Sequence, residues 1–171
     1  MNVRRALDAL YDAAGILAAL FIVGTLLMVL LGIASRLVSW FVPGTDAYAG
    51  YCMAAAGFLA LAHTFRRGEH IRVTLILEHV GTKARRGLEL WSLFTGSVLA
   101  ALFAFYSVRL VLVSWDFNDI STGNDATPLW VPQLAMALGS LVLLVAFVDA
   151  LVLAWRGKRP QAAPEEALHH E

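Results

Sequence analysis

The chain has 171 residues, of which 59% are hydrophobic and 15% are charged. Soluble domains are ordinarily about 45–50% apolar and about 25% charged, and so high an apolar content excludes a disordered chain. Thirteen basic and thirteen acidic residues give a formal net charge of zero, which excludes nucleic-acid binding driven by bulk charge. Cys52 is the single cysteine of the sequence, so a framework of disulfides within the chain is excluded as well.

Four stretches of about 20 residues contain no Lys, Arg, Asp or Glu, and this length is enough for a helix to cross a bilayer. One small soluble domain does not need so many, so we predict an all-α integral membrane protein with four transmembrane helices. The first stretch is too long for the apolar part of a signal peptide, and we expect it to be retained. The predicted spans are residues 13–37, 47–65, 88–113 and 129–155.

These spans define a single four-helix membrane domain, residues 1–158, followed by a tail, residues 159–171. The tail is rich in Pro, Ala and Glu, and we expect it to be mobile. Its adjacent histidines, His169 and His170, have no further histidine or cysteine near them in the sequence. They therefore do not predict a metal site.

The basic residues are divided unevenly between the two ends of the predicted spans. Eleven of the thirteen fall in the N-terminal tail, the second loop and the C-terminal tail, and the other two are Arg36 and Arg109. Cytoplasmic loops of membrane proteins carry an excess of Lys and Arg, so both termini are predicted to be cytoplasmic. The opposite side is acidic, with Asp46 in the first loop and three aspartates in the third.

The second loop has a basic amphipathic pattern. Its apolar residues recur at the spacing of one helical face, and several basic residues fall on the other face. The segment is too short and too charged to cross the membrane, so we predict an interfacial helix at about residues 70–86. The simplest interpretation is that the basic residues contact lipid phosphates. The more specific alternative is that part of the segment supports a partner protein. The candidates for a role in assembly are Arg66, Arg67, Gly68, His70 and Arg72.

The third loop combines turn-forming residues with aspartates. Thr127 followed by Pro128 predicts a helix N-cap with proline at the first helical position. The aspartates do not match the ligand spacing of an EF-hand, so no calcium site is predicted. A solvated acidic loop is the simplest interpretation, and docking of a soluble partner is the functional alternative. The candidates for docking are Asp46, Asp116, Asp119, Asp125 and Trp130.

Small residues at helical spacing predict faces on which helices approach closely in lipid. In the third span these residues are Ser92, Gly96, Ala100 and Ala104. Charged residues occur near the span ends and not at the centres, where an ionised group costs about 2.5–3.5 kcal/mol. We expect them to be accommodated by snorkelling or by local pairing, for example between Asp149 and Arg156 about two turns later.

No enzyme is predicted, because the sequence has no glycine-rich phosphate loop, no HExxH motif and no paired carboxylates within a span. A complete carrier usually has broken helices and polar sites at the membrane midplane. A small proton-coupled exporter needs an acidic residue in its first span, and none lies between Asp12 and Asp46. These absences favour a subunit of a larger transporter. The alternatives are a stand-alone exporter or redox carrier, or an assembly factor of another membrane complex.

Three short motifs resemble a known family. The run Arg66-Arg-Gly-Glu-His-Ile-Arg-Val73 follows the second span, and Ser121-x-Gly123 followed by Pro128-x-Trp130-x-Pro132 stands before the fourth. With four spans and both ends inside, they are similar to the small membrane subunit (DctQ-like) of tripartite ATP-independent periplasmic, or TRAP, transporters. The resemblance covers roughly residues 10 to 155.

The resemblance implies a function that this chain performs only within a complex. A periplasmic substrate-binding protein captures a substrate, commonly an organic acid, and a large multi-span subunit moves it as an elevator. The small subunit enlarges the fixed scaffold and helps to dock the binding protein. Sodium sites are then expected on the large subunit, with no cofactor in this chain. Membrane lipids are the other expected partners, no nucleic acid is expected, and the bacterial inner membrane is the expected location.

Overall fold

The structure is a computed structural model that describes residues 2–40, 42–67 and 82–157. Within these ranges the chain forms four helices: α1 (Asn2–Leu37), α2 (Thr45–Arg67), α4 (Thr82–Asp116) and α5 (Trp130–Trp155). A single isolated bridge joins Ile120 to Pro128 in the described part of the loop before α5. The predicted all-α class is therefore confirmed.

Three of these helices are long and apolar enough to cross a membrane. The qualifying stretches are Arg4–Leu37, Ala84–Asp116 and Trp130–Trp155. Helix α2 is less apolar, because alanines, glycines and polar residues make up much of it and Asp46, Arg66 and Arg67 lie at its ends. The fourth transmembrane span therefore stays a prediction.

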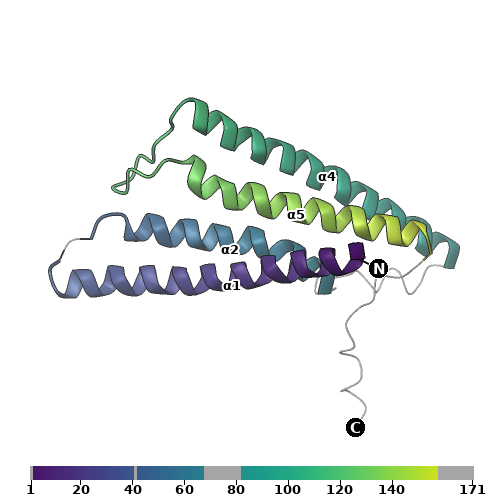
Figure 1. The fold of residues 1–171 in the computed structure, drawn as a ribbon, viewed down its shortest axis with the longest axis horizontal. Coiled ribbons are helices and arrows are strands. Elements are labelled where there is room, and N and C mark those ends of the chain that lie inside the picture. Colours follow the sequence, from purple (N-terminus) through teal and green to yellow (C-terminus); the bar gives the residue numbers. More distant parts are fainter. Residues whose placement is uncertain (1, 41, 68–81, 158–171) are drawn as a thin grey trace, which may run out of the picture.

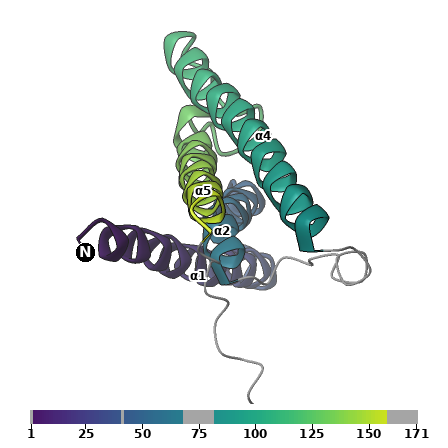
Figure 2. The ribbon, with the colours of Figure 1, turned by 90° about the vertical axis from the view of Figure 1, so that its right-hand side faces the viewer.

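The helices are arranged in the spatial order α1, α2, α5, α4. Helix α1 packs along α2, α5 packs along α4, and α2 packs against α5 to join the two pairs. Figure 2 shows α1 and α4 on opposite sides of the central pair formed by α2 and α5. The start of α1 and the end of α5 lie at the same end of the helices, and the α1–α2 and α4–α5 connections lie at the other (Figure 1).

The observed helices extend beyond the predicted spans. Helix α1 begins eleven residues earlier than its predicted span, at Asn2, and α5 agrees with its span within one residue. Residues 82–86 were assigned from the sequence to the end of the interfacial helix, but they form the first turn of α4. Thr82 to Arg86 contain no proline or glycine, so nothing interrupts the helix there. The rest of the predicted interfacial helix lies outside the described residues, as does the tail 159–171.

The predicted N-cap at Thr127 is wrong. Helix α5 begins at Trp130, and its N-cap residue Leu129 makes no side-chain capping hydrogen bond. The chain is held extended here, because Pro128 pairs with Ile120 and the Ser121 amide donates to the Thr127 carbonyl at 2.9 Å. The Thr127 hydroxyl is consequently engaged with Tyr48 of α2 and does not cap α5.

Small residues bring the helices together at specific points. A Cβ added at Gly139 of α5 would lie 2.6 Å from the carbonyl of Phe58 in α2. At Gly96 of α4 it would lie 2.5 Å from the Phe147 ring of α5. Among the predicted packing residues, Ala100 and Ala104 are buried and Ser92 is exposed. Packing through small residues is the arrangement expected where lipid provides no hydrophobic drive between helices.

The outer faces of α1 and α4 expose large apolar side chains. Ile16, Leu20 and Ile22 of α1 are each at least 60% exposed, and Phe94, Leu99 and Phe105 represent the same feature on α4. Many large apolar side chains exposed along one helix indicate contact with a membrane or with another protein. The two outermost helices thus present the surfaces through which the molecule meets its surroundings.

A matched pair of substitutions tests the close α2–α5 contact. Gly139→Ala places a methyl group against backbone atoms of Phe58, which cannot rotate away, and should destabilise the fold by about 1–3 kcal/mol. Gly57→Ala, one residue before Phe58, meets nothing within 4 Å and should be neutral or stabilising by up to about 1 kcal/mol. Thermal unfolding of both variants in detergent measures the difference. Equal unfolding temperatures would contradict a tight α2–α5 contact.

Candidate functional site

Charged side chains gather at the end of the helices where α1 begins and α5 ends. We call this group the terminal cluster: Arg4, Asp8, Tyr11 and Asp12 of α1, His63 and Arg66 of α2, and Asp149 of α5. Arg66 forms an ion pair with Asp8. Arg4 forms a second ion pair with Asp149, with 3.5 Å between Nη1 and Oδ1. The cluster therefore ties α1 to both α2 and α5.

Tyr11 lies at the centre of the terminal cluster and is only 2% exposed. Its ring packs with Ala62 and Ala146, and the guanidinium carbon of Arg66 lies 5.0 Å from the ring centroid. This is the distance of a cation–π contact. Within the described part of the chain, the Tyr11 hydroxyl has no hydrogen-bond partner. Packing and the cation–π contact, rather than a hydrogen bond, hold this residue.

His63 attaches the middle of the cluster to the α1 backbone. Its Nδ1 lies 3.2 Å from the carbonyl oxygen of Tyr11 and 3.8 Å from Oδ1 of Asp12. A carbonyl can only accept, so Nδ1 carries the proton in this contact. Gly15 of α1 leaves room for the ring, because a Cβ there would lie 2.8 Å from Nδ1. The residue acts as a contact between α1 and α2 in this arrangement.

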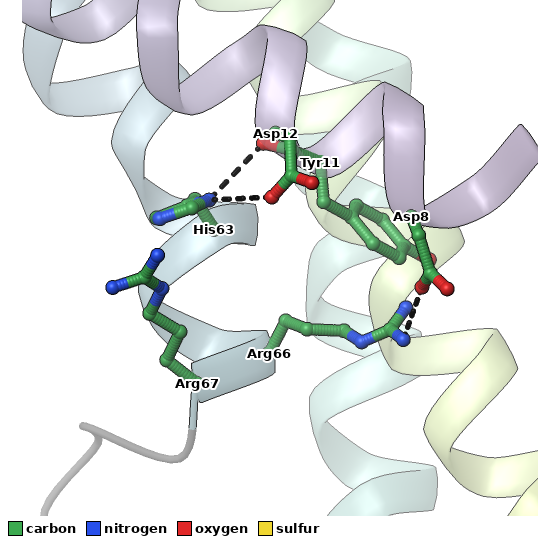
Figure 3. A pocket seen from close by; sticks show the side chains of 6 residues that line it. All are labelled: Asp8, Tyr11, Asp12, His63, Arg66 and Arg67. Atoms are coloured by element: carbon green, nitrogen blue, oxygen red, sulfur yellow. Dashed lines mark hydrogen bonds and ion pairs between the residues drawn. The ribbon is translucent and has the colours of Figure 1, made fainter. Parts of the chain in front are cut away.

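Six residues of α1 and α2 line a hollow of about 330 Å³ beside the cluster. Figure 3 shows Asp8, Tyr11 and Asp12 on one side and His63, Arg66 and Arg67 on the other. Within the described residues, Arg67 makes no ion pair or hydrogen bond, whereas Arg66 is paired with Asp8. Of the other predicted assembly residues, Gly68, His70 and Arg72 lie outside the described residues.

A second group of polar side chains lies at the opposite end of the helices. We call it the loop cluster: Tyr48 and Tyr51 of α2, and Ser121, Asp125 and Thr127 of the α4–α5 loop. The Asp125 carboxylate accepts hydrogen bonds from the Ser121 hydroxyl at 2.8 Å and the Tyr51 hydroxyl at 2.9 Å. The hydroxyls of Thr127 and Tyr48 lie 3.2 Å apart, within hydrogen-bonding distance. These bonds fasten the loop to the first two turns of α2.

Gly44 allows the loop to approach α2 this closely. Its φ of +80° lies in the left-handed region, which glycine adopts without strain. A Cβ at this position would also lie 2.7 Å from the Cβ of Asp125. Both the backbone conformation and the available space therefore require glycine here.

The loop cluster lowers the pKa of Asp125. The hydroxyl of Thr127, followed by those of Ser121 and Tyr51, stabilises the carboxylate and lowers its pKa from 3.8 to about 2. Hydrogen bonds that favour the charged form of an acid shift its pKa in this direction. Asp125 is therefore ionised, and fully engaged within the chain, at every pH near neutrality.

The other predicted docking residues are more open. Asp46 pairs with Arg36 at 3.1 Å, with side chains 85% and 74% exposed, a pair worth about 0–1 kcal/mol. Asp116 and Asp119 are exposed, and neither forms an ion pair within the described residues. Trp130 packs edge to face against Trp115, with ring centroids 4.8 Å apart. Asp116 and Asp119 are thus the free acids of this end, whereas Asp125 is a structural residue.

Sequence reasoning missed part of both clusters. It paired Asp149 with Arg156, but Asp149 pairs with Arg4 of α1. The spacing of Arg4, Asp8 and Asp12 places all three on one helical face, a signal that could have indicated a polar contact surface. The roles of Tyr48 and Tyr51 carried no such signal, because they depend on where the α4–α5 loop folds back.

Long apolar helices with polar residues gathered at their two ends are typical of a helical membrane protein. The family model for the DctQ component of tripartite ATP-independent periplasmic transporters matches residues 25–157. The chain belongs to this family, which confirms the resemblance seen in the sequence. Neither the curated proteins nor the solved structures contain a significant match. The family is a component of a transporter, not a class of enzyme.

The lowered pKa of Asp125 predicts how stability depends on pH. Because the folded-state pKa lies below the unfolded value of 3.8, ionised Asp125 stabilises the fold above about pH 4, and this contribution disappears as pH falls toward 2. Asp125→Asn should lower the unfolding temperature at pH 7, and its difference from the wild type should shrink between pH 4 and pH 2. Tryptophan fluorescence during heating measures both, with Asp119→Asn as the exposed control. A difference that persists at pH 2 would contradict this role.

Proposed function

We propose that the chain is the small scaffold subunit of a sodium-coupled, binding-protein-dependent secondary transporter that imports an organic acid. It crosses the bacterial inner membrane four times, with α2 as the fourth span and both termini in the cytoplasm. The distribution of charge carries the proposal: basic residues are concentrated at the end where α1 begins, and exposed aspartates lie at the other. The positive-inside rule orients a chain of this kind.

The helices support a scaffold role better than a carrier role. No charged residue lies between Asp12 and Arg36 in α1, or between Trp130 and Val148 in α5. Carriers bind substrate and ions at polar midplane sites, so the sites for substrate and sodium belong on the large membrane subunit. The exposed apolar faces of α1 and α4 offer this chain the area for contact with that subunit and with lipid.

The end that carries Asp116 and Asp119 suits contact with a soluble binding protein. Both side chains are exposed, and the loop cluster holds the adjoining loop against α2. A fixed loop with free charges supports transient docking, because charge complementarity raises the rate of encounter and selects the partner. The periplasmic binding protein docks at this end.

Association with a larger subunit tests the scaffold role. The tagged chain, expressed with the large multi-span subunit of a TRAP transporter from the same organism, should co-purify with that subunit in mild detergent. Liposomes should accumulate the substrate only when they contain both subunits, the binding protein and a sodium gradient. Accumulation by liposomes that hold this chain alone would overturn the proposal and favour a stand-alone exporter.

Charge reversal tests the docking role. Asp116→Lys combined with Asp119→Lys should weaken binding of the binding protein to the purified complex at least tenfold at low salt, with less effect at high salt. Glu89→Lys makes the same kind of change at the opposite end of the helices and should leave binding unchanged. Surface plasmon resonance on complexes of equal yield gives the comparison. Equal affinity of the reversed and wild-type complexes at every salt concentration would refute docking at these aspartates.

A further inference from the structure

The hollow beside the terminal cluster is lined by charged side chains, and not all of them are paired with one another. Its lining includes two acidic and two basic side chains, so its formal charge is zero while His63 is neutral. Asp8 and Arg66 neutralise one another. Arg67 has no ion pair within the described residues, and Asp12, 69% exposed, has only His63 at 3.8 Å. An arginine without an ion pair among the described residues, and an aspartate whose contact there is His63, therefore line the same hollow (Figure 3).

The depth of the hollow matches that of lipid headgroups. The apolar stretch Arg4–Leu37 has 34 residues, which gives a helix roughly 51 Å long at 1.5 Å per residue. The hydrocarbon core of a bilayer is about 30 Å thick, so the first turns of α1 extend beyond it. Asp8 and Asp12 lie in these turns, whereas the exposed apolar residues Ile16 and Leu17 follow one turn later. A lipid whose headgroup enters the hollow can lay its acyl chains along that apolar face.

We propose that this hollow binds the headgroup of a zwitterionic phospholipid that carries a primary ammonium group, as in ethanolamine phospholipids. Arg67 binds the phosphate and Asp12 accepts hydrogen bonds from the ammonium. A guanidinium matches phosphate oxygens in geometry and charge. The volume of about 330 Å³ equals that of roughly ten water molecules, which is ample for this headgroup.

Charge complementarity selects this headgroup over other lipids. An anionic glycerol headgroup has no cation to place beside Asp12, so the net negative charge of that headgroup would lie next to the Asp12 carboxylate. A choline headgroup has a cation but no N–H group to donate to the carboxylate. The proposal rests on the position of α1 in a bilayer and not on any step of transport.

Lipid retention by the full-length chain tests the proposal. The purified chain is delipidated in detergent, mixed with equal amounts of ethanolamine, choline and glycerol phospholipids with identical acyl chains, and analysed by native mass spectrometry. The ethanolamine lipid should be retained at least fivefold over each of the others. Equal retention of all three lipids, or preference for the glycerol lipid, would overturn the proposal.

Two variants separate the roles of the free charges. Asp12→Asn should bring the ethanolamine lipid down to the level of the choline lipid, and Arg67→Gln should reduce retention of both. The controls Asp119→Asn and Arg156→Gln make the same changes at exposed positions outside the hollow and should retain the preference. Unfolding temperatures within the range of the controls show that the variants are folded. A preference that survives both hollow variants would contradict the assignment.

A soluble headgroup is the other source of the same chemistry. O-phosphoethanolamine should not displace the bound lipid at millimolar concentration, because it lacks the acyl chains that contact α1. If this compound displaced the lipid at the concentration at which the lipid itself binds, the hollow would be a site for a soluble ligand. That result would contradict the lipid assignment.

Discussion

The close approach of α2 and α5 holds the two halves of the molecule together. Helix α1 contacts α2 along its length and touches α5 only weakly, and α4 packs on α5. The close contact at Gly139, together with the ring contacts Phe58–Phe103 and Phe65–Phe147, joins the pair α1–α2 to the pair α5–α4. In lipid, such contacts depend on fit between surfaces, because apolar side chains gain nothing by leaving the acyl chains.

Polar contacts between helices add to the packing, and in the described residues they lie at the two ends of the helices. The terminal cluster joins α1 to α2 and α5 through ion pairs, and the loop cluster joins the α4–α5 loop to α2 through hydroxyls and one carboxylate. Placed there, these charges avoid the cost of burial in hydrocarbon. Between the two ends the helices pack mainly through small residues and aromatic side chains, among them the stacked rings of Phe58 and Phe103.

The sequence predicted the helical class, the family and four spans, three of which the structure confirms as helices able to cross a membrane. These features could be predicted because all depend on local patterns of charge and apolarity. Contacts between distant residues were less accessible. Arg4 lies far from Asp149 in the chain, and only the antiparallel arrangement of the helices brings them together. Thr127 showed a locally favourable cap, yet the bridge between Ile120 and Pro128 and the hydroxyl of Tyr48 compete for that segment. Tertiary contacts therefore overrode the local preference at this turn.

The pairing of Arg4 with Asp149 also sets an order for biogenesis. Helix α1 leaves the ribosome first and α5 last, so Arg4 waits for its partner until nearly the whole chain has been synthesised. Asp8 meets Arg66 much sooner, when α2 emerges. The α1–α2 hairpin can therefore form during translation, whereas the second ion pair closes only when the last helix has been inserted. The terminal cluster thus joins the first and the last of the described helices to be synthesised.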